Sequence, residues 1–215
     1  MTETEQRLKE TFQIEIRQEL TACLRDAYDA AITAHDPDVG HDAMSFGLLV
    51  YKSNVYFLGQ LAERVDWMTV ITPAPSFEFQ IGQYAISCYS AGHTDDVDAK
   101  DSFPNNHTRA GRIAEANSGQ VRIFDEFWKD DSACRQLILA HKGNPGEGLL
   151  EVFVAVPITK GEDGRVKEWG TVYTVWSRSI EGEAGLPASG PTVPPENVTP
   201  FRPSLRKKSD TNEEQ

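Results

Sequence analysis

The chain has 215 residues and a formal net charge of −12 at pH 7, with 33 acidic and 21 basic residues. Such an acidic surface repels phosphate backbones, so we do not expect a nucleic-acid-binding protein. No apolar run is long enough to span a membrane, and the N-terminal residues lack the apolar stretch of a signal peptide. Three widely spaced cysteines without a secretory signal indicate reduced thiols, so we expect a cytoplasmic protein.

Residues 2–34 are predicted to form one long helix. Thr2 and Glu5 are spaced as a capping box, in which each side chain pairs an amide of the first turn. Apolar residues recur every three or four positions and form a single stripe: Leu8, Phe12, Ile16, Leu20, Leu24, Ala27 and Ala31. The stripe predicts a helix that lies along a sheet, with a homodimer interface as the alternative.

Short apolar segments indicate strands in the next part of the chain. Residues 46–51 are predicted to be a first strand and residues 67–72 a second one. Residues 54–64 fit a helix or a strand, and we favour the helix. Residues 77–89 are predicted to be one long strand whose apolar face changes after Gly82, which suggests a β-bulge at that glycine.

Three β-branched and aromatic segments between Leu137 and Trp176 are separated by Gly-rich, charged turns. This pattern predicts an antiparallel meander of strands at residues 137–141, 149–156 and 169–176. Before it, a polar loop at residues 91–106 and helices at 108–117 and 121–131 are expected.

Taken together, these elements predict a single α+β domain at residues 1–180. It has a mostly antiparallel sheet of about six strands, with the long N-terminal helix packed on one face. From Glu181 onward the chain contains six of its twelve prolines together with Gly, Ser and charged residues. We therefore expect residues 181–215 to be a disordered tail.

Two clusters of histidine and aspartate suggest a divalent-metal site. Residues 35–42 contain two histidines and three aspartates, and a second acidic segment follows Gly92. Imidazoles and carboxylates both supply lone pairs to divalent cations. If the two segments folded against each other, a metal could be shared by His35, His41, His93 and Asp95. Solvated turns with local hydrogen bonds are the simpler interpretation.

The turn that follows the first strand of the meander is a second candidate site. Its exposed amides could cradle an anion, with Lys142 adding charge and His141 a titratable group. His141, Lys142 and Asn144 are therefore the ligand-binding candidates. The turn lacks the Gly-Lys-Ser/Thr sequence before a helix that defines a phosphate loop. Glycines in hairpins more often serve the backbone conformation of the turn.

The sequence contains no motif for nucleophilic catalysis. No Gly-x-Ser-x-Gly motif occurs, and no cysteine lies in an electropositive setting. The sequence therefore favours a non-catalytic binding or interaction domain, accessory or regulatory, with a protein partner or a small ligand. The alternative is a metal-assisted hydrolase that uses the His/Asp cluster.

Overall fold

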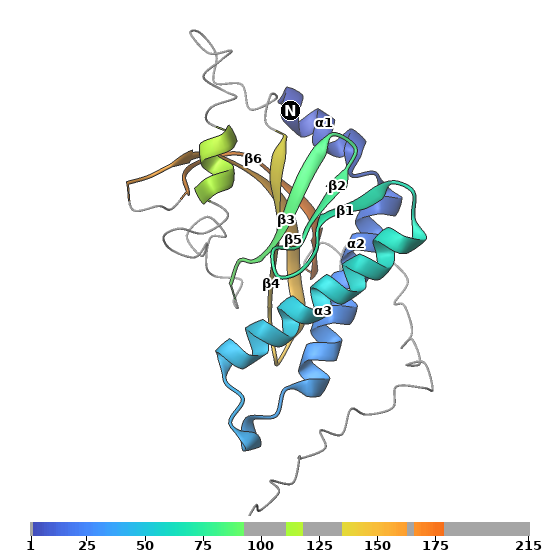
Figure 1. The fold of residues 1–215 in the computed structure, drawn as a ribbon, viewed down its shortest axis with the longest axis vertical. Helices are drawn as coiled ribbons and strands as arrows, with labels where there is room; N and C mark the ends of the chain where they lie inside the picture. Colours follow the sequence, from blue (N-terminus) through green and yellow to red (C-terminus); the bar gives the residue numbers. More distant parts are fainter. Residues whose placement is uncertain (1, 93–110, 118–134, 163–165, 179–215) are drawn as a thin grey trace, which may run out of the picture. The chain divides into compact units, whose positions relative to one another are not determined.

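The computed structural model describes residues 2–92, 111–117, 135–162 and 166–178. It confirms an α+β domain in which helices pack on a six-stranded, mostly antiparallel sheet (Figure 1). The predicted tail at residues 181–215 and the predicted helix at 121–131 lie outside the described residues. The elements are α1 (Glu3–Thr11), α2 (Ile14–Ala34), the 3-10 helix η1 (Pro37–Val39), α3 (Ala43–Arg64), β1 (Met68–Thr72), β2 (Glu78–Ile81), β3 (Tyr84–Ser90), β4 (Gln136–Asn144), β5 (Gly148–Lys160) and β6 (Val166–Ser177).

The N-terminal helical region consists of two helices, so the prediction of a single helix was wrong. The capping box is present, because the Thr2 hydroxyl accepts from the Glu5 amide at 3.1 Å and the Glu5 carboxylate accepts from the Thr2 amide at 3.3 Å. The helix breaks at Phe12, which leaves the helical conformation and is fully buried. The break lets α1 pack on β6 while α2 packs on β5 and α3.

Residues 46–51 belong to α3 and do not form the strand that was predicted there. Asp42 starts this helix, because its carboxylate accepts from the Ser45 amide at 2.8 Å. One helix then runs through residues 46–51 and through residues 54–64, where a helix was predicted. A six-residue apolar run is too short to distinguish the repeat of a helix, about 3.6 residues, from that of a strand, about two residues. Over the full helix the buried residues recur at helical spacing: Phe46, Val50, Asn54, Leu58 and Leu61.

Residues 77–89 form the hairpin of β2 and β3, so the prediction of one bulged strand was wrong. Gly82 has a φ of +56°, a left-handed conformation that glycine adopts without strain. It forms a tight turn with Gln83 that pairs Ile81 with Tyr84. The change of apolar face after Gly82 therefore marks a reversal of the chain.

The sheet has the order β1-β2-β3-β4-β5-β6. Every neighbouring pair is antiparallel except β3 and β4, which run parallel and so need a crossover between them. The predicted meander is confirmed as β4, β5 and β6. The strand number agrees with the prediction, although the hairpin at Gly82 supplies the strand that was expected at residues 46–51.

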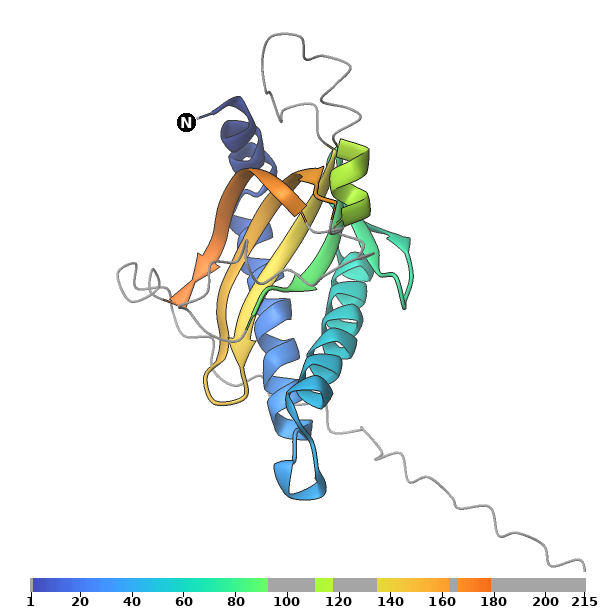
Figure 2. The same cartoon turned by 90° about the vertical axis from the view of Figure 1, so that its left-hand side faces the viewer.

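Both faces of the central strands are covered. Along β4, Leu137, Leu139 and His141 face the helices α2 and α3, which lie side by side against one face of the sheet (Figure 2). Ile138 and Ala140 face the opposite side, where they pack in a second cluster with Ile113 of the helical segment 111–117. This double cover explains why β4 and β5 are near-continuous apolar runs.

Candidate functional site

His141, a ligand-binding candidate, lies in the core with 2% of its surface exposed. It sits on β4 between Ser90 of β3 and Val152 of β5. Its Nδ1 is 2.9 Å from the Tyr28 hydroxyl on α2, and its Nε2 is 3.0 Å from the Asn54 amide nitrogen on α3. One imidazole therefore links the sheet to both helices, and we call Tyr28, Asn54 and His141 the His141 cluster.

The His141 imidazole is neutral near neutral pH. Burial lowers its pKa to about 4, because the core disfavours the charged form. A neutral imidazole has one donor and one acceptor. Since the Asn54 amide nitrogen donates to Nε2, the ring hydrogen lies on Nδ1 and is donated to the Tyr28 oxygen. Burial also raises the pKa of Tyr28, so the phenol keeps its proton.

The residue types around His141 invite comparison with a Cys-His-Asn catalytic set, since Cys88 lies nearby on β3. The geometry and the protonation states argue against this chemistry. Burial raises the pKa of the Cys88 thiol to about 12, whereas a nucleophilic cysteine must be a thiolate. The Nδ1 atom of His141 is paired with Tyr28. A histidine with a pKa of about 4 is also poorly matched to proton transfer near pH 7.

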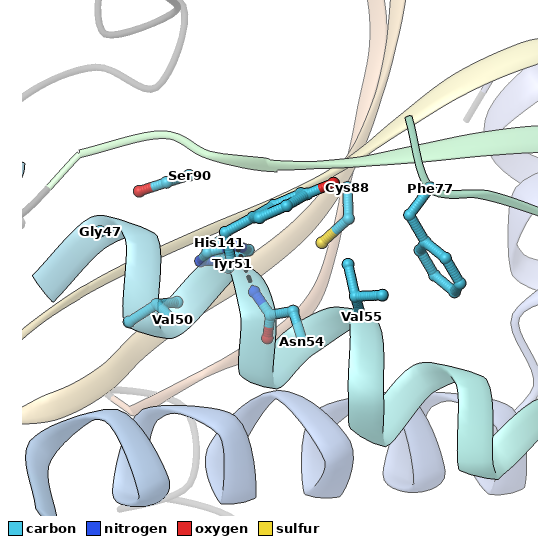
Figure 3. A pocket seen from close by; sticks show the side chains of 9 residues that line it. All are labelled: Gly47, Val50, Tyr51, Asn54, Val55, Phe77, Cys88, Ser90 and His141. Carbon is cyan, nitrogen blue, oxygen red and sulfur yellow. Dashed lines mark hydrogen bonds between the residues drawn. The ribbon is translucent and has the colours of Figure 1, made fainter. Parts of the chain in front are cut away.

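A small cavity lies beside the His141 cluster (Figure 3). Its volume is about 40 Å³, room for a few water molecules, whereas pockets for small organic ligands measure roughly 300–1,000 Å³. Asn54 points its amide nitrogen at His141, while its Oδ1 is buried and has no hydrogen-bond partner among the described residues. The cavity therefore does not fit a metabolite-sized substrate. Its lining consists of Gly47, Val50, Tyr51, Asn54, Val55, Phe77, Cys88, Ser90 and His141.

The other two candidates of the turn are paired within the chain. The Lys142 ammonium is almost buried and lies 3.1 Å from the carboxylate of Glu151, its cross-strand partner on β5. The Asn144 side-chain oxygen accepts from the amides of Gly146 and Glu147 at 3.0 and 2.8 Å. In this structure the two side chains neutralise and organise the hairpin, and anion binding at the turn stays a prediction.

The structure brings two of the four metal-ligand candidates together. The rings of His35 and His41 have centroids 5.8 Å apart, and Nδ1 of His41 accepts from the Asp36 amide at 3.0 Å. His93 and Asp95 lie outside the described residues. Within the described ranges, no three His, Cys, Asp or Glu side chains are placed to hold a metal ion.

Sequence reasoning missed a groove of about 500 Å³ between α3 and β1. It is lined by Val55, Gly59, Ala62, Glu63, Met68, Thr69, Val70, Pro73, Ala74 and Phe77. Nearer the start of α3, two apolar side chains face outward: Met44, which is 83% exposed, and Leu48, which is 52% exposed. The only charged residues among the 22 of α3 are Lys52, Glu63 and Arg64. This low charge was visible in the sequence, but it signals an exposed apolar face only once the segment is recognised as a surface helix.

Comparison with known proteins assigns no family to this chain. No protein-family model, no curated protein and no solved structure matched it. In the described part of the chain, no helix has both the length and the apolar character needed to cross a lipid bilayer. A proposal of function therefore depends on the geometry of the described residues.

Gly143 tests how closely the His141 cluster is packed. A Cβ atom there would overlap the Tyr28 ring and the Gly148 carbonyl oxygen. We expect Gly143→Ala to lower the free energy of unfolding by about 1–3 kcal/mol through overpacking. Gly146→Ala in the turn that follows β4 is the control, because the nearest atom to its added Cβ is 3.4 Å away. Equal stability of the two variants in denaturant unfolding would contradict this packing.

The depressed pKa of His141 predicts a pH-dependent stability. Its folded-state value of about 4 lies below the ordinary 6.5, so the unfolded state binds more protons between these values. The stabilising contribution is complete above about pH 6.5 and is lost as the pH falls towards 4, to a total of about 3 kcal/mol. Denaturant unfolding at a series of pH values measures it. The fall in unfolding free energy between pH 6.5 and about pH 4 should become smaller in His141→Gln and persist in the control His41→Gln. An unchanged fall in His141→Gln would show that His141 is not the group responsible.

Proposed function

We propose that this chain is a non-catalytic binding domain that docks an apolar segment of a partner protein. The docking face consists of the exposed side chains of Met44 and Leu48 on α3 and the groove beside β1, which Val55 lines as well. The observation that supports this proposal best is the exposure of Met44 and Leu48, one helical turn apart, on the helix that also forms one wall of that groove. Exposed apolar surface marks interaction sites in soluble proteins when it gathers in a patch.

The charge distribution over the helices supports the same surface. Five of the nine residues of α1 and six of the 21 residues of α2 are charged, which is usual for helices with a solvated face. α3 buries one apolar face against the sheet and presents a second apolar face outward, with few charges between them. Packing within the described chain uses the first face. Met44 and Leu48 remain exposed, and a partner would bury them.

The interior of the domain supports a binding role over catalysis. The neutral imidazole of His141, the protonated phenol of Tyr28 and the protonated thiol of Cys88 are all held away from reactive states by burial. The cavity beside them is too small for a metabolite-sized substrate.

A photo-crosslinking amino acid at position 48 tests the proposal in cells that produce the protein naturally. We expect it to give one discrete crosslinked protein, because Leu48 would lie against the partner. The same amino acid at position 39 is the control, since Val39 is also exposed but lies on η1, outside the docking face. The captured protein, identified by mass spectrometry and produced separately, should bind the wild-type chain in calorimetry and lose affinity for Leu48→Glu.

Four results would overturn the proposal. The first is the same products from positions 39 and 48, and the second is no product at position 48. The third is undiminished binding of the purified partner to Leu48→Glu. A crosslink to a second copy of the chain would also contradict it, since the face would then be a homodimer interface.

A further inference from the structure

We infer that the groove between α3 and β1 takes a short extended peptide that adds as a strand to the outer edge of β1, with a Lys or Arg placed at Glu63. This inference rests on the proposed function, because it specifies the segment that the docking face would hold. Its evidence comes from the edge of the sheet, the wall of α3 and the charge of the groove.

The groove follows the edge of β1. Side chains alternate between the two faces of a strand, so Met68 and Val70 point to one face and Thr69 to the other. All three line the groove, which is possible when it runs along the strand's edge. β1 is the first strand in the sheet order, and within the described part of the chain its only strand partner is β2. An outer strand edge beside a groove is the arrangement that binds extended peptides through main-chain hydrogen bonds.

Gly59 leaves space on the side of the groove that α3 forms, opposite β1. A Cβ atom added there would meet nothing within 4 Å, so internal packing does not require a glycine at this position. Glycine inside a helix costs about 1 kcal/mol relative to alanine. The missing side chain, with the small Ala62 further along the same wall, leaves room for another chain to approach the helix. One end of the groove is fixed by the Tyr51 hydroxyl, which donates to the Pro75 carbonyl and ties the turn before β2 to α3.

The charge of the groove indicates which charge the bound peptide should carry. Glu63 is the one charged residue among those that line it. The chain as a whole carries a net charge of −12, which repels acidic segments and attracts basic ones. An apolar peptide with a Lys or Arg near Glu63 therefore fits better than a neutral or acidic one. The five residues of β1 correspond to about 17 Å of extended chain, which sets the length of the bound segment to about five residues.

Selection from a phage-displayed library of random peptides against the full chain tests the inference. The selected peptides should share apolar residues at alternate positions and a Lys or Arg. A synthetic selected peptide, labelled for fluorescence anisotropy, should lose at least about tenfold in affinity when alternate amides are N-methylated, because the β1 edge would lose its hydrogen bonds. Glu63→Gln should weaken binding of that peptide more than binding of its Lys→Met or Arg→Met analogue.

Two glycine variants of α3 provide a matched pair. Gly59→Gln fills the groove and should weaken peptide binding at least about tenfold, while thermal unfolding shows equal or higher stability because a helical glycine is replaced. Gly47→Gln makes the same change in the same helix, again with open space around the added Cβ, but outside the groove. It should leave the affinity unchanged.

The outcomes separate this inference from the proposed function. A consensus with apolar residues every three or four positions, or binding that tolerates N-methylation, would overturn the extended mode. The extended mode would also be overturned if every selected peptide bound Gly59→Gln as tightly as the wild-type chain, or if no peptide were selected. In each of these cases the proposed function still stands if the crosslink at position 48 forms and Leu48→Glu weakens partner binding. If those two results fail as well, the inference and the proposed function are both wrong.

Discussion

The arrangement of this domain depends on how the imidazole of His141 is satisfied in the core. A buried neutral histidine needs one donor and one acceptor, and these come from Asn54 on α3 and Tyr28 on α2. Loss of either partner would leave a buried polar atom unpaired, at a cost of about 1–3 kcal/mol. Because Asn54 must face the sheet, the rotation of α3 about its axis is fixed. Met44 and Leu48 then lie on an outward face of the helix.

The orientation of α3 that pairs Asn54 with His141 also separates the interior of the domain from the proposed binding face. His141 is hydrogen-bonded to Tyr28 and Asn54, and burial holds His141 and Cys88 in unreactive protonation states, so this cluster fixes positions and offers little chemistry. The proposed recognition surface is the part of α3 that this inward pairing leaves outside, together with the strand edge beside it. A polar link inside and exposed apolar side chains outside are therefore two consequences of one helix orientation.

Local patterns predicted part of this fold and not the rest. Apolar, β-branched and aromatic runs separated by Gly-rich turns were sufficient to predict β4 to β6. The Thr2–Glu5 capping box was recognisable because its partners are three residues apart. The apolar run at residues 46–51 fits the repeat of a helix or that of a strand. Only the spacing of the buried residues over the whole of α3 identifies a helix. The role of His141 could not be predicted, because its partners lie 113 and 87 residues away in the sequence. The groove was hidden for a related reason, since it joins α3 to a turn and an edge strand.

Nitrogen-15 NMR of the His141 ring tests the central claim most directly, because it reports both the tautomer and the protonation state of the imidazole. The account predicts a neutral ring with its hydrogen on Nδ1 and no titration between about pH 8 and pH 5. An imidazole that titrates near its ordinary value of 6.5 would contradict it. So would a hydrogen on Nε2, because α3 would then be held to the sheet by a different bond from the one described.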